Sequence, residues 1–318
     1  MKIFQSMEEI NNIEPTAVAV GNFDGIHLGH QAIIKKAVYD AKGEGYKSAV
    51  FTFSNHPRNL MESKKNVKGI LYMEDKLKII EELGIDYVFN VPFTEDIMYM
   101  EPVDFIDHIL VQKMNMREVL CGFNYHFGRK AEGNVQLLIS EGMKKNFGVH
   151  VAEAFKVNGN VVSSTLIREK IALGDMEGCE ALLGRPYAIK GEVVVGNKLG
   201  KKFGFPTSNM NIDDSMVSPP NGVYITVCIY DNISYPSITN VGNKPTIGEY
   251  VKNIETHIFN FDRELYGKEI KVEFVTKLRD ERKFDSFADL ENEIDKNCRE
   301  ALEYHRKIKG SFLCGIRT

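Results

Sequence analysis

The residues best suited to chemistry stand in one short stretch, GNFDGIHLGH, at positions 21–30. His27 and His30 are three residues apart, so they share one face where a helix begins. Two imidazole groups on one face can stabilise the extra charge of a phosphoryl group during an in-line displacement. Gly25 and Gly29 let a ligand approach the backbone without interference from a Cβ atom. The stretch predicts a phosphate site, and a cap or surface role for the histidines is the alternative.

The elements around this stretch support the prediction. An apolar segment at 17–21 precedes it, and a helical pattern follows from Leu28. A glycine-rich turn between strand and helix is where parallel sheets bind phosphate, because unpaired N–H groups and the helix dipole favour anions. Four other short apolar segments follow, at 48–53, 86–91, 117–122 and 149–154. Amphipathic helical patterns lie between them. This rhythm predicts an α/β domain with a parallel sheet and helices on both faces.

Two further segments of this half carry candidate phosphate and ligand contacts. Ser163, Ser164 and Thr165 stand at a predicted helix start, as N-cap residues prefer. With Thr165 as the cap, Arg168 takes the third helical position, where a cation opposes the helix dipole. An anionic ligand would remove this conflict, whereas pairing with a surface carboxylate is the alternative. Asn124 lies in an aromatic and glycine-rich loop after a strand, which could also be a packed hairpin.

A transition-metal site in this half is disfavoured. The histidines at 27, 30, 56 and 126 match no common zinc spacing, and no cysteine or paired carboxylate accompanies them.

The rhythm changes near residue 185. Strand patterns then follow one another with only turns between them, at 187–195, 222–230, 233–240, 254–260 and 268–276. Consecutive strands without helices predict an antiparallel barrel or sandwich. A last helix is expected over about 286–309. We therefore predict two domains, 1–184 and 185–318.

The second half has its own candidate phosphate loop, within residues 191–212. Glycines recur there every four residues among lysines, and those we single out are Gly196, Lys198, Gly200, Lys201 and Gly204. Bare N–H groups and positive charge suit a polyphosphate, although solvated lysines on a barrel turn are the alternative.

Three oxygen-bearing side chains could complete a catalytic site beside this loop. Thr207 and Asn209 offer hard oxygen ligands that could share Mg²⁺ with phosphate oxygens. Glu255 stands on a strand pattern, where a carboxylate near bound ATP could act as general base for an alcohol. An ordinary solvent-facing role for this carboxylate is the alternative.

Bulk properties limit the classes of protein. The 318 residues carry a net charge of −4, with 43% hydrophobic and 26% charged residues, as in ordinary globular proteins. This charge gives no reason to expect nucleic acid or a membrane surface as partner. The five scattered cysteines and the absence of an apolar leader favour a cytoplasmic protein with reduced thiols. The sequence does not fix the oligomeric state.

Eight motifs in order resemble the bacterial bifunctional riboflavin kinase/FMN adenylyltransferase (FAD synthetase) family. They are GNFDGIHLGH, GFNYHFGRKAEGN, SSTLIR, LLGRPY, GFPTSN, NGVY, NVGNKPT and ETHIFNFDRELYGKEI, spanning about residues 16–308. The resemblance implies a Rossmann-like nucleotidyltransferase domain followed by a riboflavin-kinase β-barrel with a C-terminal helix. It implies that riboflavin and ATP give FMN in the second domain, and that FMN and ATP give FAD and pyrophosphate in the first.

The resemblance also implies roles for individual residues. His27 and His30 would bind ATP phosphates in the transition state, and Glu255 would activate the ribityl 5′-hydroxyl. Phosphate contacts are implied for Ser163, Ser164, Thr165 and Arg168, and a contact with the flavin phosphate or adenylyl group for Asn124. The nucleotide pocket is assigned to Gly21, Asn22, Phe23, Asp24 and Gly25. Thr207 and Asn209 would hold Mg²⁺-ATP, and Arg279 and Phe284 belong to a loop resembling the flavin-covering flap.

The chain departs from the family pattern at four positions. Asn55 replaces a frequent proline, Lys201 a frequent arginine, Ser208 a frequent alanine and Asn297 a frequent aspartate. Phosphoryl transfer needs mainly positioning and charge stabilisation, and the groups for both are present. Two alternatives stay open, namely a chain with only one of the activities and a flavin-binding protein without catalysis.

Overall fold

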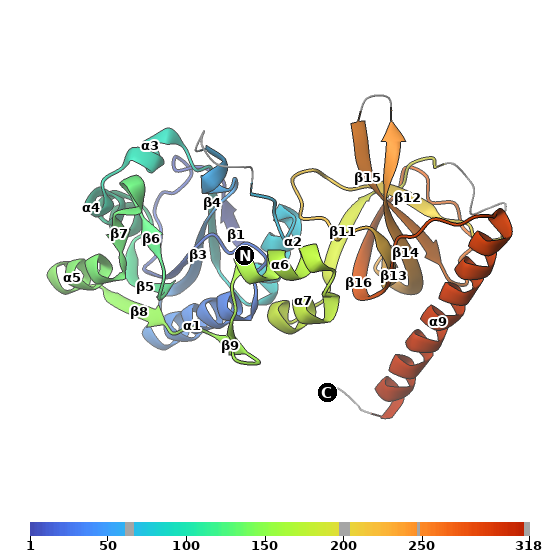
Figure 1. Cartoon of the computed structure of the whole chain (residues 1–318). Coiled ribbons are helices and arrows are strands. Elements are labelled where there is room, and N and C mark those ends of the chain that lie inside the picture. The colour runs from blue at the N-terminus through green and yellow to red at the C-terminus, as the bar shows by residue number, and fades with distance from the viewer. Residues whose placement is uncertain (61–66, 197–203, 247–248, 315–318) are drawn as a thin grey trace. The chain divides into compact units, whose positions relative to one another are not determined.

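The computed structural model describes residues 1–60, 67–196, 204–246 and 249–314. The chain divides into two units, Met1–Ser164 and Thr165–Thr318, each of which is described by itself (Figure 1).

The first unit is built on a six-stranded parallel sheet in the order β1-β4-β3-β2-β5-β8. The strands are β1 (Lys2–Phe4), β2 (Thr16–Val20), β3 (Lys47–Phe53), β4 (Tyr87–Val91), β5 (Met116–Gly122) and β8 (Gly148–Ala152). The five apolar segments of the sequence are all strands of this sheet, which confirms the predicted α/β class. Strand β1 was not predicted.

Helices cover both faces of the sheet because its buried strands are apolar on both sides. Ala17 and Ala19 of β2 face a core shared with α1 (Leu28–Glu44) and α2 (Met73–Glu82). Val18 and Val20 of the same strand face the opposite core. The elements of that second face are η2 (Phe105–Lys113) and α5 (Val135–Lys145), preceded by α3 (Glu95–Tyr99) and α4 (Pro102–Asp104). Segment η2 is π-helical.

The strand order determines where a ligand can bind. After β2 the chain continues to β3, which pairs with one edge of β2. Strand β5, later in the chain, pairs with the other edge of β2. The adjacent strands β2 and β5 therefore flank a topological switch point, where ligands bind beyond the carboxyl ends of parallel strands. The 21–30 stretch follows β2, and Asn124 follows β5.

Small elements complete the first unit. The segment after β5 forms a hairpin of β6 (His126–Phe127) and β7 (Gly133–Asn134), joined by the short helix η3 (Arg129–Ala131). Another hairpin pairs β9 (Lys156–Val157) with β10 (Asn160–Val161), turning at Asn158 and Gly159, which both have positive φ angles. The short helix η1 (Pro57–Leu60) follows β3.

The next helices are α6 (Ser164–Leu173) and α7 (Met176–Leu183). Helix α6 begins one residue before Thr165, so the prediction that Thr165 is its N-cap is wrong. Arg168 consequently lies further into the helix than its third position, and the argument from an opposed dipole at the helix start does not hold. Three candidate cap residues in a row, Ser163, Ser164 and Thr165, left the start ambiguous in the sequence.

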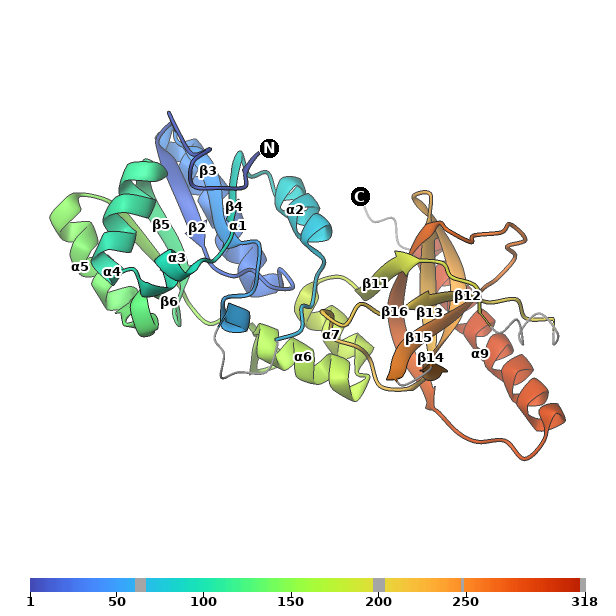
Figure 2. The same cartoon turned by 90° about the horizontal axis from the view of Figure 1, so that it is seen from above.

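The second unit is an antiparallel six-stranded sheet in the order β11-β16-β13-β14-β15-β12 (Figure 2). The strands are β11 (Tyr187–Glu192), β12 (Ser208–Asn211), β13 (Gly222–Tyr230), β14 (Ile233–Thr246), β15 (Glu249–Ile258) and β16 (Glu269–Asp280). A bridge from Val194 to Asn209 links the two ends of this order and nearly closes a barrel. Strand β12 was not predicted.

Apolar and hydroxyl side chains share the barrel interior. Thr226 contacts Ser237 and Thr239, each with an oxygen–oxygen distance of 2.8 Å, and Thr239 contacts Thr256 at 2.9 Å. The hydroxyls thus join β13, β14 and β15 and satisfy one another inside the barrel. Helix α9 (Phe287–Cys314) packs on the outer face, where Ile238 belongs to the core that it covers.

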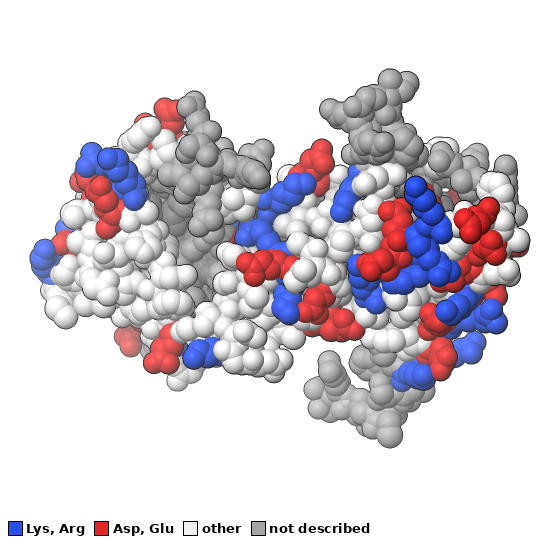
Figure 3. All heavy atoms as spheres, viewed as in Figure 1, with Lys and Arg blue, Asp and Glu red and all other residues white. Residues whose placement is uncertain are grey.

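Surface charge is mixed. On the face shown in Figure 3, basic and acidic side chains are interleaved over the second unit. Among the residues that the structure describes, we find no helix of sufficient length and apolar character to cross a bilayer. In the described part of the chain, Cys121, Cys179, Cys228 and Cys298 are buried and form no disulfide.

Candidate functional site

The turn after β2 has a backbone that only a specific sequence can adopt. Phe23, Gly25 and Ile26 have positive φ angles of 47°, 79° and 36°. Phe23 and Ile26 are buried, which anchors the turn in the core despite its strain. A Cβ atom on Gly25 would lie 3.1 Å from Cγ2 of Ile70. The backbone angle therefore favours glycine at position 25, and a Cβ atom there would crowd Ile70.

The two histidines lie against each other at the start of α1. His27 is the N-cap, and its Nδ1 accepts a hydrogen bond of 3.2 Å from the backbone N–H of His30. An accepting Nδ1 assigns the proton of a neutral His27 ring to Nε2. The rings stack with centroids 3.5 Å apart, and His30 also meets Phe23 edge-on. The spacing of the two histidines thus produces the shared face that the sequence predicted.

His30 is an uncharged donor at neutral pH. Burial, followed by the charges of His27 and Lys76, holds the pKa of His30 well below its usual value. Its Nδ1 is buried and has no hydrogen-bond partner among the described residues. A buried imidazole nitrogen at a predicted phosphate site is available for a hydrogen bond with a ligand.

A buried lysine, which the sequence analysis did not single out, lies under the same turn. Lys76 of α2 is 5% exposed. Its Nζ donates to the carbonyl oxygen of Asn22 at 2.8 Å and to Oγ1 of Thr52 at 2.7 Å. Thr52 in turn donates to the Asn22 carbonyl at 3.1 Å. The available signal was the position of Lys76 one helical turn before the buried Ile80, on the apolar face of α2.

Asp24 and Asn22 join the turn to neighbouring segments. The backbone N–H of Ile70 donates to Oδ1 of Asp24 at 3.0 Å, and Ser164 Oγ donates to its carbonyl at 2.9 Å. The amide nitrogen of Asn22 lies 3.4 Å from Nε2 of His56. The structure therefore brings Asn22, Asp24, the histidine pair and Ser164 into one neighbourhood.

Other predicted residues of this site are less closely gathered. Asn124 is exposed beside Gly122, at the end of the neighbouring strand β5. Arg129, which follows in that loop, forms an ion pair of 2.9 Å with Glu101. Thr165 and Arg168 belong to the second unit, and their relation to the turn stays a prediction.

In the second unit, strand register brings two predicted residues together. Asn209 of β12 lies directly opposite Glu255 of β15. Residues directly opposite in an antiparallel pair project from the same face with Cβ atoms about 4.5–5.5 Å apart. On the other side of β15, Asn240 of β14 also lies opposite Glu255. The candidate base is thus flanked by two carboxamides in one row across three strands.

The amide of Asn209 is held by its surroundings. The Nδ2 of Asn253 donates to Oδ1 of Asn209 at 3.2 Å. The Nδ2 of Asn209 lies 3.4 Å from Oγ1 of Thr207. A Cβ atom on Gly196 would lie only 2.4 Å from this amide, so position 196 must be glycine for the loop to approach. Gly204 has a φ of 79°. Lys198, Gly200 and Lys201 lie outside the described residues.

The candidate flap residues are tied to α9. Nε of Arg279 donates to Oδ1 of Asn297 at 2.8 Å and lies 3.3 Å from Oε1 of Glu293. The guanidinium groups of Arg279 and Arg282 lie 5.8 and 4.8 Å from the ring centre of Phe284. Arg282 also pairs with Glu293. Arg279 and Phe284, both predicted from sequence, are therefore parts of one cluster.

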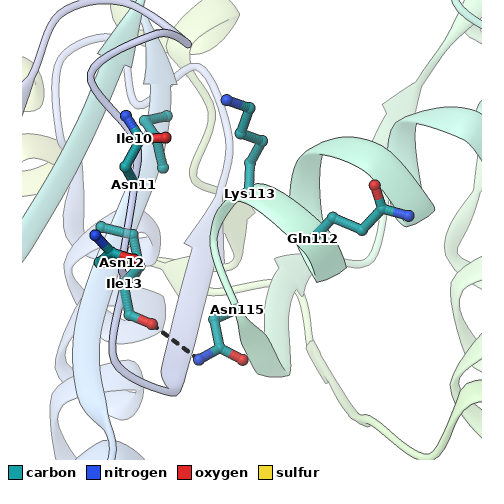
Figure 4. Close-up of a pocket in the computed structure, with 7 residues that line it drawn as sticks. All are labelled: Ile10, Asn11, Asn12, Ile13, Gln112, Lys113 and Asn115. Carbon is teal, nitrogen blue, oxygen red and sulfur yellow. Dashed lines mark hydrogen bonds between the residues drawn. The ribbon is translucent and has the colours of Figure 1, made fainter.

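A cavity of about 280 Å³ lies elsewhere in the first unit (Figure 4). Amide side chains dominate its lining, and Asn115 donates to the carbonyl of Ile13 at 2.9 Å there. The lining residues precede β2 and β5. The cavity is thus at the amino ends of these strands, whereas the histidine turn follows their carboxyl ends.

Comparisons with known proteins agree with this division of sites. A family model described as FAD synthetase matches residues 9–166, and one described as riboflavin kinase matches residues 183–305. A Bacillus subtilis protein named bifunctional riboflavin kinase/FMN adenylyltransferase is 34% identical over 92% of this chain and 94% of its own length. This chain belongs to the bifunctional riboflavin kinase/FMN adenylyltransferase family.

Other matches extend over the whole chain. A family member from Haemophilus influenzae is 33% identical over 96% of this chain and 99% of its own length. A crystal structure described as a macrolide-efflux protein from Streptococcus pneumoniae has a TM-score of 0.86 at 25% identity, over 93% of this chain and 97% of that chain. The last likeness confirms the predicted succession of folds, and the family follows from the named relatives.

Proposed function

We propose that the chain makes FAD from riboflavin in two ATP-dependent steps, one in the predicted domain 1–184 and one in the predicted domain 185–318. The barrel transfers the γ-phosphoryl group of ATP to the 5′-hydroxyl of riboflavin, giving FMN and ADP. The α/β unit joins the FMN phosphate to the α-phosphorus of ATP, and the bond to the β-phosphate breaks to release pyrophosphate. The observation that carries this proposal is the match of an FAD synthetase model to residues 9–166 and of a riboflavin kinase model to residues 183–305.

In the adenylyl-transfer site, the histidine turn binds the ATP phosphates. The stacked rings of His27 and His30 supply donors for the charge that develops as pyrophosphate leaves. Gly21, Asn22, Phe23, Asp24 and Gly25 line the nucleotide pocket. Further contacts come from Asn124 to the FMN phosphate or the adenylyl group, and from Ser163, Ser164, Thr165 and Arg168 to phosphate. The position of the turn at the switch point supports these roles.

In the kinase site, Glu255 accepts the proton of the riboflavin 5′-hydroxyl as this oxygen attacks the γ-phosphorus. Its place opposite Asn209 supports this role, because a base must act close to the bound phosphates. Arg279 and Phe284 cover the flavin. We assign contacts with the ATP phosphates to the loop residues Gly196 and Gly204, and the same role to Lys198, Gly200 and Lys201, which lie outside the described residues.

Mg²⁺ fits the donors of the kinase site. Thr207 and Asn209 offer neutral oxygens, which suit a hard cation that keeps phosphate and water oxygens as its other ligands. Among the described residues, no group of three or more His, Cys, Asp or Glu side chains could hold a metal alone. Bound there, Mg²⁺ would neutralise the phosphate charge, while Asn253 orients the Asn209 amide.

We place the functional boundary near residue 185, close to residue 183 where the riboflavin kinase match begins, and the enzyme in the cytoplasm. ATP, riboflavin and FMN are its substrates.

A product assay tests this function. Purified protein is incubated with riboflavin and Mg²⁺-ATP, and the flavins are separated by chromatography over time. FMN should form first and FAD afterwards. Riboflavin that stays unphosphorylated would refute the kinase step, and FMN that accumulates without FAD would refute the adenylyl transfer. Retention of flavin without ATP turnover would identify a non-catalytic binding protein.

A further inference from the structure

The buried ammonium group of Lys76 connects three segments of the first unit. It donates to the carbonyl of Asn22 in the turn and to the hydroxyl of Thr52 at the end of β3, from its own place on α2. Thr52 closes the triangle by donating to the same carbonyl. The Asn22 carbonyl, five residues before His27, is therefore held jointly by Lys76 and Thr52.

In the described part of the chain no carboxylate contacts this cation directly, and Asp24 acts on it only through longer-range electrostatic attraction. Among the described residues, Lys76 forms no ion pair within 4.0 Å, and both of its hydrogen-bond acceptors are neutral. Burying an unpaired charge is costly unless another group compensates it. A lysine with only structural use would be replaced at lower cost by an apolar side chain on this apolar helix face. The arrangement thus calls for an anion that the protein does not itself provide.

The charged groups around Lys76 do not supply that anion in full. On the turn, the carboxylate of Asp24 raises the pKa of the lysine, but burial lowers it by more, to about 8. Lys76 also acts on the His30 ring on α1, while His27, the N-cap of that helix, and His56, beside Asn22, are the other imidazoles at the turn. None of these three rings carries negative charge.

We propose that Lys76 is a positioning residue of the adenylyl-transfer site, which fixes the Asn22 carbonyl and supplies the buried positive charge that draws the ATP phosphates to the histidine turn. This inference rests on the proposed role of that turn in FMN adenylylation. Lys76 would thus join His27 and His30 at the site. It comes from α2, which lies outside the GNFDGIHLGH motif.

The proposal has a definite pH dependence. In the free enzyme, the ammonium form is complete well below pH 8 and is lost as the pH rises through about 8. Because phosphates favour the ammonium form, kcat/KM for ATP in FAD formation should fall as the pH rises through that value. His30, with its lowered pKa, is already neutral there and contributes no change.

The test uses the full chain and measures FAD formation from FMN and ATP between pH 6.5 and 9.5. Lys76→Met keeps the length of the side chain and removes its charge. We expect a loss of roughly 10- to 100-fold in kcat/KM for ATP at pH 7 and no remaining alkaline decline. Lys78→Met, at an exposed position of the same helix, is the matched control and should behave as wild type. FMN formation from riboflavin should be unchanged in both variants.

A second variant keeps the proposal testable if Lys76→Met does not fold. Thr52→Val preserves shape but removes one acceptor of the ammonium group, so the alkaline decline should move to lower pH. An alkaline decline that is absent from the wild type, or unmoved by Thr52→Val, would overturn the role of Lys76. A wild-type protein that makes no FAD would instead refute the adenylyl transfer itself, so the two failures are distinguishable.

Discussion

The two sites of this chain are assembled in different ways. The adenylyl-transfer site is a strained turn that long-range contacts hold in place, with Lys76 and Ile70 reaching it from distant segments. The kinase site instead depends mainly on strand register, which sets Asn209 opposite Glu255. A site of the first kind can fail when a remote residue changes. A site of the second kind should fail mainly when its own side chains change.

The largest expected effect separates the two sites directly. Replacing both His27 and His30 by alanine removes the donors of the adenylyl-transfer site and leaves the barrel intact. FAD formation from FMN should fall by roughly 1,000-fold or more, because each transition-state donor contributes about 100- to 1,000-fold. FMN formation from riboflavin should stay within about twofold of wild type.

Chromatographic separation of the flavins after each half-reaction measures both effects. A double variant that still makes FAD at the wild-type rate would show that the turn does not act in catalysis. Loss of both products with loss of the circular-dichroism signal would show that the two units do not fold independently, which would contradict the comparison.

The converse variant is Glu255→Gln, which keeps the shape of the side chain and removes the candidate base. FMN formation should fall by roughly 100- to 10,000-fold, the usual contribution of a general base. FAD formation from added FMN should be unaffected. Asn211→Ala, an exposed change on the neighbouring strand β12, provides the control. Equal loss of kcat in both half-reactions would exclude a base confined to the barrel.

The sequence could predict the site residues that secondary structure positions locally. It could not predict the residue that a long-range contact brings to the site. The spacing of His27 and His30 places them together once a helix begins, and alternation along β15 places Glu255 on a defined face. Both are local consequences of secondary structure. Lys76 lies 54 residues from Asn22, and nothing local to either segment indicates that they meet. Only its place on an apolar helix face indicated that it is buried.

Most of the fold was also predictable from local sequence patterns, and the prediction failed where an element is too short to carry such a pattern. Buried parallel strands give unbroken apolar segments, so the five long ones were found. Strands β1 and β12 are short, with three and four residues, and carry too few alternations for a pattern. The start of α6 was misplaced because local cap preference does not distinguish neighbouring hydroxyl residues.

A smaller effect is expected from Asn253→Ala, which tests whether the kinase site also uses a supporting residue. The change removes the donor to Oδ1 of Asn209 and frees its amide to rotate. The apparent affinity for Mg²⁺-ATP in FMN formation should fall roughly 10-fold, as for other residues that orient ligands. Titration of the initial rate with Mg²⁺ at fixed ATP measures it. An unchanged titration would mean that register alone positions Asn209.

The smallest effect concerns stability and compares two glycines of the first unit. Gly25→Ala places a Cβ atom at a φ of 79° and 3.1 Å from Ile70, so we expect a loss of about 1–2 kcal/mol in the free energy of unfolding. Gly43→Ala, near the end of α1, meets no atom within 4 Å and should instead stabilise by up to about 1 kcal/mol. Urea unfolding of both variants measures the difference. A Gly25 variant as stable as wild type would mean that the turn relaxes without cost, and the first site would then not be the strained one.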